Sequence, residues 1–427
     1  MSGNQRLNGS DYLMLGFDHE LRRCGYAGNS CQIILELGSG ISRDLLENRL
    51  NELCRRWPVL QARPGGVFLP RWRVPPPREL MATPSIHVHR SEAGLEHRLC
   101  NQPLAIESGE LLRFDLIESQ GSGARVLFTW AHALMDAPSA EYVLTLIGRQ
   151  DLTFPIGQNA TKPDQTSLSF AARLKLAWKT LYRIDRMCGA APQSLGTRKT
   201  EAPKTLAYRV EKFSADESQR IRDNAVRLCG PLGAAQFHAA AAMVELDRLH
   251  ARLARPSPSY VLPLPVGLRP KGAIEPIFSN QVIMLMTQFL PEDLQSVEKA
   301  VALLKREMHE ALRSNLLESG RILSELFRFL PLPIYMGVLK KGLGGEICSL
   351  FYGDTAAVNP HLTNFLGAPI LDFVHVAAIT PSPGLGVIFY YFQRNLRVTI
   401  LHLLPVLSNE EAAEFASKLR TRLLEPS

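Results

Sequence analysis

One histidine stands at the end of a buried-strand pattern, where it could accept a proton. The run Val126–Ala131 is mostly apolar and aromatic, it ends at His132, and Asp136 follows four residues later. An Ala-rich stretch comes next, so the pattern predicts a strand, a short junction and the start of a helix. A junction histidine can take a proton from a hydroxyl, amine or thiol, because its ordinary pKa of ~6.5 is near neutral pH. Taken alone, the spacing favours a core histidine and a capping aspartate.

Further segments of the chain support the chemical interpretation. The stretch around His132 resembles the His-His-x-x-x-Asp-Gly motif of the CoA-dependent acyltransferase superfamily, which includes chloramphenicol acetyltransferase, nonribosomal peptide condensation domains and wax ester synthase/diacylglycerol acyltransferases. Other segments resemble parts of these proteins in the expected order: Leu7–Leu15, Leu45–Arg63, Gln102–Leu116, Leu262–Pro270 with Ser279-Asn280, and Leu362–Pro369. The resemblance therefore covers nearly the whole chain.

Two positions depart from the family motif. Ala131 stands where the first histidine is expected, and Ala137 stands where the final glycine is expected. Family members with only the second histidine are active, so Ala131 weakens the assignment little. The Ala137 methyl group has two interpretations: it narrows the passage for the acceptor, or it marks a site that has lost its activity.

The resemblance implies an α/β (α+β) fold. It consists of two chloramphenicol-acetyltransferase-like subdomains, each a mixed sheet with flanking helices, with an active-site tunnel between them. The Pro-, Ser- and Thr-rich composition of 150–206 marks the crossover between the halves. We therefore expect an N-terminal subdomain at 1–165, a crossover linker with an amphipathic helix at 166–204 and a C-terminal subdomain at 205–427.

The resemblance also assigns roles to residues. His132 is the expected general base, and Asp136 shares its motif. An aspartate four residues after the histidine is expected to point away from the cleft and to form a buried ion pair with Arg269. Thr363, Asn364 and Trp130 are the expected substrate- or oxyanion-binding residues.

Other candidate groups at the site have weaker support. His361 is the one rival base, whereas His87 and His89 alternate on a strand and suit surface or core positions. Ser139 follows His132 too closely to be a triad nucleophile, and no Gly-x-Ser-x-Gly segment occurs. Neither an acyl-enzyme nor a metal site is predicted.

The function that the resemblance implies is transfer of an acyl group from an acyl-CoA to a hydroxyl acceptor. Two alternatives stay open. The first is a free-standing condensation enzyme that forms an amide or ester from an acyl group on an acidic carrier protein. The second is a catalytically silent binding relative. The thioester is a co-substrate in this scheme, no bound cofactor is expected, and the chain is expected to be a monomer.

Composition limits the remaining classes. The chain has 427 residues, 46% hydrophobic and 21% charged, which is ordinary for a globular protein of two domains. It shows no apolar run of membrane-spanning length, no secretory pattern at its start and seven scattered cysteines, so we expect a cytoplasmic protein with reduced thiols. The net charge of +7 suits an anionic partner such as CoA, but solubility explains it equally well. No nucleic-acid-binding pattern is present.

Two apolar segments each have more than one interpretation. Residues 167–187 predict an amphipathic helix with basic and Trp-containing character, either lying across the domain junction or resting on a membrane surface. The junction is favoured. Residues 321–343 are rich in large apolar side chains and interrupted by Pro331 and Pro333, which suits a core helix pair or a lid better than a membrane anchor. Together with Ala137, this segment suggests a substrate pocket with a narrow entrance beside the histidine and an apolar wall farther out. Such a pocket suits a long hydrophobic acyl group.

Overall fold

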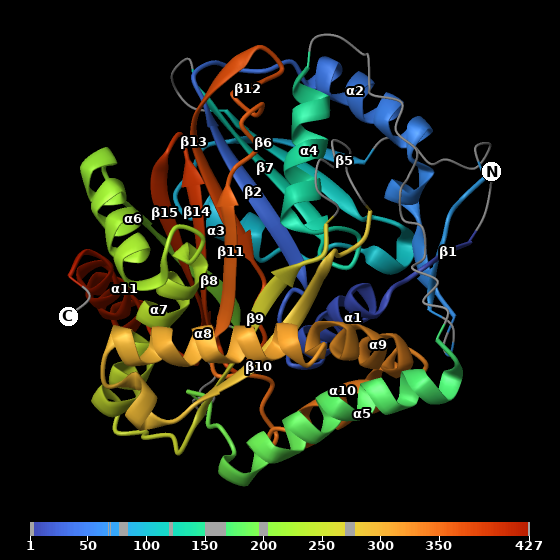
Figure 1. Cartoon of the computed structure of the whole chain (residues 1–427). Helices are drawn as coiled ribbons and strands as arrows, with labels where there is room; N and C mark the ends of the chain where they lie inside the picture. The colour runs from blue at the N-terminus through green and yellow to red at the C-terminus, as the bar shows by residue number, and fades with distance from the viewer. Residues whose placement is uncertain are drawn as a thin grey trace.

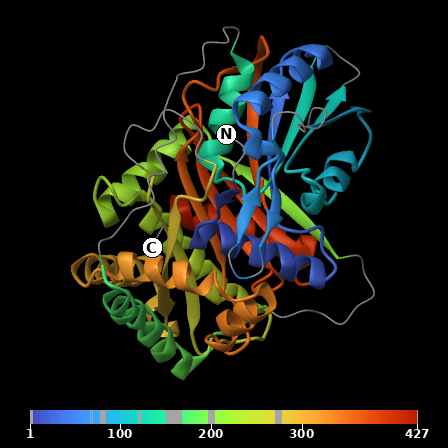
Figure 2. The same cartoon turned by 90° about the vertical axis from the view of Figure 1, so that its right-hand side faces the viewer.

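The computed structural model describes residues 4–66, 68, 70–76, 84–118, 123–149, 168–195, 204–269 and 278–425. Two sheets dominate the molecule, and helices cover their outer faces (Figure 1). The first half of the chain supplies most of one sheet, and the second half supplies the other together with most of a layer of helices below both (Figures 1 and 2). Each sheet contains both parallel and antiparallel pairs. The expected α/β class with two mixed sheets is confirmed.

The first sheet has six strands in the order β12-β13-β2-β7-β6-β5. Its members from the first half are β2 (Ser30–Leu37), β5 (Ser85–Arg90), β6 (Leu112–Glu118) and β7 (Ala124–Ala131). The central strands are buried along nearly their whole length because both faces of the sheet are covered. The helices of this half are α1 (Gly9–Arg23), α2 (Arg43–Arg56), α3 (Leu95–Cys100) and α4 (Ala137–Gly148). A small sheet beside them contains β1 (Asn4–Arg6), β3 (Arg63–Gly65) and β4 (Arg71–Arg73).

The second sheet has four strands in the order β11-β14-β15-β8. They are β8 (Thr205–Lys212), β11 (Phe351–Ala357), β14 (Leu385–Phe392) and β15 (Asn395–Leu404). Their covering helices are α6 (Ala215–Cys229), α7 (Ala234–Arg252) and α11 (Asn409–Leu424). The helix α11 begins after Ser408, whose hydroxyl accepts the Glu411 amide in a reciprocal capping box.

Two strands of the second half cross into the first sheet. The strand β13 (Ala368–Ala377) pairs antiparallel with β2, and β12 (Asn364–Phe365) pairs with β13. The proposed domain boundaries at 165 and 205 stay a prediction, and any division there leaves β12 and β13 within the sheet of the other half. The two halves are therefore joined by continuous backbone hydrogen bonding as well as by packing.

The lower layer joins the two halves from below (Figures 1 and 2). It contains the ribbon of β9 (Tyr260–Gly267) with β10 (Val282–Phe289) and four helices: α5 (Phe170–Met187), α8 (Val297–Arg313), α9 (Leu316–Phe327) and α10 (Leu332–Lys341). The segment 321–343 is thus a helix pair broken at Pro331, as its prolines predict. Within the described part of the chain, no helix is long and apolar enough to cross a membrane.

Candidate active site

His132 lies directly after β7, in the turn that leads into α4. Its backbone amide donates to the Asn29 carbonyl at 3.1 Å, which extends the pairing of β7 with β2 by one residue. The Leu134 amide then bonds the Ala131 carbonyl at 2.9 Å and closes the turn. The strand ends here because α4 begins at Ala137, with Pro138 in its first turn. The imidazole is consequently carried by a short junction whose two ends are fixed by secondary structure.

The imidazole of His132 is half-buried, and its two nitrogens differ. The Nδ1 atom is enclosed and has no hydrogen-bond partner among the described residues. Burial lowers the pKa of His132 from its ordinary 6.5, and the charge of Asp136 partly opposes that shift. The ring is therefore neutral at pH 7, which is the protonation state that a general base requires.

The Asp136 carboxylate serves the backbone and a neighbouring cation. It caps α4 by accepting the Ser139 amide at 3.1 Å. Its Oδ1 atom also accepts from Nη2 of Arg269 at 2.7 Å, and its Oδ2 atom accepts the Gln281 amide at 3.3 Å. Asp136 thus fixes the loop after His132 to the β9–β10 ribbon of the second half.

Arg269 has a second partner on α4. Its Nη2 atom donates to the buried Ser139 hydroxyl at 2.6 Å. This hydroxyl is therefore engaged by a guanidinium and faces the helix start, an arrangement that does not suit a nucleophile. The ion pair is partly screened from water, since the side chains of Arg269 and Asp136 are only 18% and 15% exposed.

Asn280 connects the histidine turn to the N-terminal segment. Its side-chain amide donates to the His132 carbonyl at 2.9 Å and to Oδ1 of Asp11 at 3.0 Å. Its backbone amide donates to the same Asp11 oxygen at 2.6 Å. Asn280 lies in a segment that resembles the family, but the resemblance assigns it no role. The structure makes it the bridge between three stretches of chain that are distant in sequence.

Asp11 is a buried carboxyl to which the resemblance assigns no role. It is 2% exposed, and burial raises its pKa from 3.8 to about 7, although hydrogen bonds from Asn280 and Asn8 oppose this shift. The available signal was local: Asn8 and Asp11 form the capping box at the start of α1. The second use of Asp11, as an anchor for Asn280, depends on contacts more than 260 residues apart in sequence.

Trp130 is part of the protein interior. Its side chain is 1% exposed and stacks on Phe128 with ring centroids 5.4 Å apart. Its indole N–H donates to the Met135 carbonyl at 3.1 Å. This bond uses the single donor of the indole. Trp130 therefore braces the turn that carries His132, and this arrangement leaves it no donor for an oxyanion.

Thr363 and Asn364 lie at the opposite end of α4 from His132. Both are exposed, and the Asn364 carbonyl lies against Gly148, where an added Cβ would be 3.0 Å away. Gly148 is twelve residues after Asp136, and a helix rises 1.5 Å per residue, so the separation along α4 is ~18 Å. The structure does not bring these two residues to the histidine. The rival His361 is also exposed in the same loop.

Other histidines contact carboxylates and link packed elements of the fold. His375 of β13 contacts Glu141 of α4 at 2.9 Å, and His238 of α7 contacts Asp354 of β11 at 2.9 Å. His89 contacts Asp115 at 2.9 Å on neighbouring strands. These pairs suit structural roles, because each links two packed elements. Among the described residues, no group of three or more His, Cys, Asp or Glu side chains could hold a metal.

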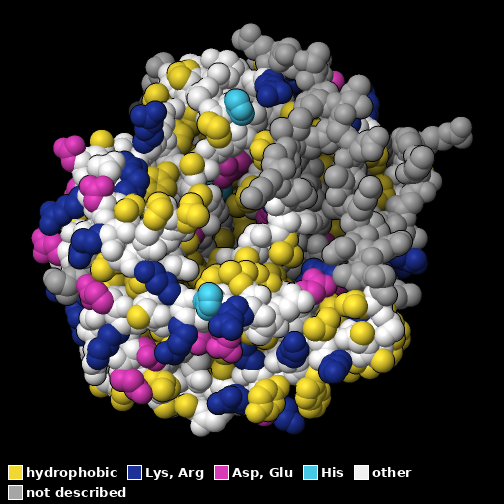
Figure 3. All heavy atoms as spheres, in the orientation of Figure 1, with side chains coloured by type: hydrophobic (Ala, Val, Ile, Leu, Met, Phe, Trp, Pro, Cys, Tyr) yellow, Lys and Arg dark blue, Asp and Glu magenta, His cyan; other side chains and the backbone are white. Residues whose placement is uncertain are grey.

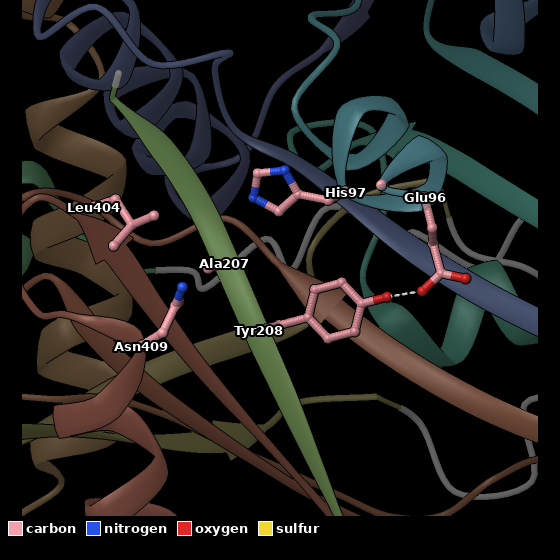
Figure 4. Close-up of a pocket in the computed structure, with 7 residues that line it drawn as sticks. Glu96, His97, Ala207, Tyr208, Leu404 and Asn409 are labelled. Atoms are coloured by element: carbon pink, nitrogen blue, oxygen red, sulfur yellow. Dashed lines mark hydrogen bonds between the residues drawn. The ribbon is translucent and has the colours of Figure 1, made fainter. Parts of the chain in front are cut away.

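The molecular surface is hollowed near the middle of one face. Figure 3 shows hydrophobic side chains around this hollow, over the region where Figure 1 places β11, β9 and the lower end of α4. A separate cavity of about 640 Å³ lies between α3 and the second sheet and is lined by Gly94, Glu96, His97, Ala207, Tyr208, Leu404 and Asn409 (Figure 4). The Tyr208 hydroxyl donates to Glu96 across its wall. His132 is not among its lining residues. The expected tunnel to the histidine stays a prediction. The central hollow is the candidate for its entrance.

Comparison with known proteins gives a structural answer only. The sequence matches no family model and no curated protein. The structure matches the first condensation domain of the calcium-dependent antibiotic synthetase in complex with a substrate analogue, at TM-score 0.70 and 14% identity, over 100% of this chain and 98% of that one.

Two further matches are similar in extent. A trichothecene 15-O-acetyltransferase from Fusarium sporotrichioides matches at TM-score 0.70 and 13% identity, over 99% of this chain and 95% of that one. The starter condensation domain of rhizomide synthetase, in complex with C8-CoA and Leu-SNAC, matches at TM-score 0.65 and 15% identity, over 100% and 95%. The chain therefore has the two-lobed fold of condensation domains and of this acetyltransferase, as the sequence resemblance implies.

Proposed function

We propose that this chain, built on the fold of condensation domains and acetyltransferases, transfers an acyl group from an acyl-CoA thioester to a hydroxyl acceptor, with His132 as the general base. One observation carries the proposal. A half-buried, neutral imidazole stands on a turn of the first half that residues of the second half hold in place: Asn280 holds the His132 carbonyl, and Arg269 holds Asp136. A turn restrained in this way suits a group that must be presented to a substrate at a fixed position.

The proposed reaction needs no covalent enzyme intermediate. As the acceptor oxygen attacks the thioester carbon, its proton passes to the imidazole of His132. The enclosure of Nδ1 leaves Nε2 as the accepting atom. The tetrahedral intermediate then collapses, the C–S bond breaks, and the imidazolium returns the proton to the thiolate. The products are an ester and free CoA, and the histidine ends in its starting state.

The solved relatives support a thioester donor but leave its carrier open. One of them contains C8-CoA, and several are condensation domains of peptide synthetases. Since likeness at 13–15% identity establishes the fold alone, the choice of acyl-CoA rests on the sequence resemblance to stand-alone acyltransferases. The acceptor class, hydroxyl rather than amine, rests on the same resemblance.

The test is release of free thiol from a panel of acyl-CoAs in the presence of alcohol and amine acceptors. His132→Ala should lower the rate by ~10²–10⁴-fold without loss of fold, because a half-buried junction imidazole contributes little packing. His361→Ala is the matched control and should keep full activity, since that residue is exposed in a distant loop.

The possible failures of this test have different meanings. Full activity in a well-folded His132→Ala protein would remove the general-base assignment. If the wild type is active only with acyl groups bound to a carrier protein, then the carrier-bound thioester is the donor in place of acyl-CoA. A wild type that is inactive with both donors would identify a silent binding relative.

A further inference from the structure

The helix α5 carries large apolar side chains on its solvent side. Phe170, Leu174, Trp178 and Tyr182 follow one another at intervals of four residues, and we call them the α5 stripe. Their exposed fractions are 65%, 46%, 68% and 57%. Residues four apart lie on the same side of a helix, so the stripe forms one surface along the whole of α5. A surface of this kind on an otherwise polar exterior calls for a partner.

The buried side of α5 is fixed to the protein. Ala177 is 2% exposed and packs in a small core with Ile322 and Leu323 of α9. The Thr180 and Ser319 hydroxyls are 2.7 Å apart, and the Ser319 hydroxyl also bonds the Leu176 carbonyl. These contacts determine which side of α5 faces outward. The stripe cannot turn inward without breaking them.

Cations accompany the stripe. The helix α5 contains five Lys or Arg side chains and one acidic side chain, Asp185. Lys175, Lys179 and Arg186 are exposed beside the apolar residues. Figure 3 shows the same alternation, with hydrophobic and basic side chains interleaved along the lower edge where Figure 1 places α5. Basic side chains around an apolar strip containing Trp and Tyr are typical of helices that lie in a membrane interface.

The neighbouring helix α10 extends the same end of the molecule. Gly342, just after α10, lies against Ile184 of α5. Ile334 and Val338 of α10, also four residues apart, are 55% and 41% exposed. The last turn of α10 carries Lys340 and Lys341. Figures 1 and 2 show α5 and the α9–α10 pair together at this end of the molecule.

We propose that the α5 stripe binds the surface of an anionic lipid bilayer, with α5 lying parallel to the membrane plane. The apolar side chains would enter the boundary between headgroups and acyl chains, while Lys175, Lys179 and Arg186 contact the headgroups. A protein partner fits less well, because the centres of protein interfaces are depleted in lysine, whereas an anionic membrane attracts it. The inference is independent of the proposed acyl transfer and goes beyond it.

The experiment is flotation of the full-length protein with lipid vesicles. Vesicles of phosphatidylcholine with phosphatidylserine should carry the wild type upward, and vesicles of phosphatidylcholine alone should carry less. W178S/Y182S should lower the vesicle partition coefficient at least ~10-fold, because two large apolar side chains leave the interface. K175E/R186E should lower binding to the anionic vesicles by at least ~25-fold, at about fivefold for each cation removed.

The control removes equally exposed apolar side chains elsewhere. V226S/L232S changes two residues in and beside α6 that are 51% and 99% exposed, and it should bind like the wild type. Circular dichroism of each variant verifies the fold. Equal flotation of all variants, or no flotation of the wild type, overturns the proposal. Dimerisation of the wild type that W178S/Y182S abolishes, without vesicle binding, would overturn it in favour of a second copy of this chain.

Discussion

Replacing Asp136 with alanine should destabilise the protein as well as slow the reaction. The carboxylate accepts the Ser139 amide as the cap of α4, pairs with Arg269 and accepts the Gln281 amide. Alanine can do none of these. It also leaves the Arg269 guanidinium without its counter-charge, and the Nε and Nη1 atoms of Arg269 are already buried without a partner among the described residues. The substitution therefore removes a helix cap and leaves the Arg269 cation uncompensated in a poorly hydrated site.

The expected size of the effect follows from these contacts. Loss of an N-cap costs ~1 kcal/mol. Loss of one partner of a fully buried ion pair costs ~3–5 kcal/mol, and the 15–18% exposure of this pair reduces that to ~2 kcal/mol. The sum is ~3 kcal/mol. If 427 residues unfold together, the unfolding entropy is ~0.9 kcal/mol/K, so the expected fall in melting temperature is ~3 °C.

Two companion variants separate the contributions. Asp136→Asn keeps a good N-cap but loses the charge, so it should recover ~1 kcal/mol relative to Asp136→Ala. Arg269→Ala keeps the cap and loses the pair. A double-mutant cycle between Asp136→Ala and Arg269→Ala should give a coupling energy of ~1–3 kcal/mol, because the two side chains contact each other directly.

The assay combines denaturant unfolding with thiol release on the same preparations. Stability and rate should fall together in Asp136→Ala, and the rate should recover partly in Asp136→Asn. The reasoning is refuted if Asp136→Ala loses activity with unchanged stability, because the carboxylate would then act in the chemistry and not in holding the loop. A coupling energy near zero would refute the ion pair specifically.

Three further predictions concern protonation and substrate size. The acidic limb of the kcat/KM profile should have its midpoint below pH 6.5, because burial lowers the pKa of His132; a midpoint above 6.5 would contradict that assignment. Asp11 has a pKa raised from 3.8 to about 7 in the folded chain, so its contribution to the free energy of unfolding should fall by ~4 kcal/mol as pH rises between these values, and urea unfolding of Asp11→Asn should lack this part of the slope. Catalytic efficiency should rise several-fold per added acyl methylene, at ~0.8 kcal/mol each, until the pocket is full. A preference for acetyl-CoA would contradict the prediction that residues 321–343 form an apolar wall of the substrate pocket.

The bounds of individual strands could be predicted closely where a short apolar run has clear ends. The sequence predicts strands at 30–37 and 124–131, and both match the structure, because apolar runs of strand length are bounded by polar or turn residues. The sequence also predicts one long helix near 292–317, bounded by Pro291 and Gly320, but the structure divides it. The α8 helix ends at Arg313, and Asn315 adopts a left-handed backbone with φ of 57° before α9 begins. Asn tolerates that conformation, and the apolar periodicity continues past it, so the sequence carries little warning of the break.

The site could be predicted only in part, because some of its contacts join segments that are far apart in the sequence. The contact of Asp136 with Arg269 follows from two motif segments. The position of Thr363 and Asn364 does not, because it depends on where the crossover strand β13 enters the first sheet. Once β13 pairs with β2 and β12 pairs with β13, β12 lies against Gly148, at the wrong end of α4 to reach the histidine. The order of segments in the sequence does not indicate where along β2 the strand β13 will pair.

The histidine turn takes its shape from both halves of the molecule. The first half supplies β7 and α4, which determine where the turn starts and ends. The second half supplies Asn280, which holds the His132 carbonyl, and Arg269, which holds Asp136. Asp11 then fixes Asn280 from the N-terminal segment through both its backbone and side-chain amides. Because none of these bonds exists within the first half alone, the second half adds restraints that the first half cannot supply. A change that loosens the docking of the two halves should therefore slow the reaction without altering any group that reacts.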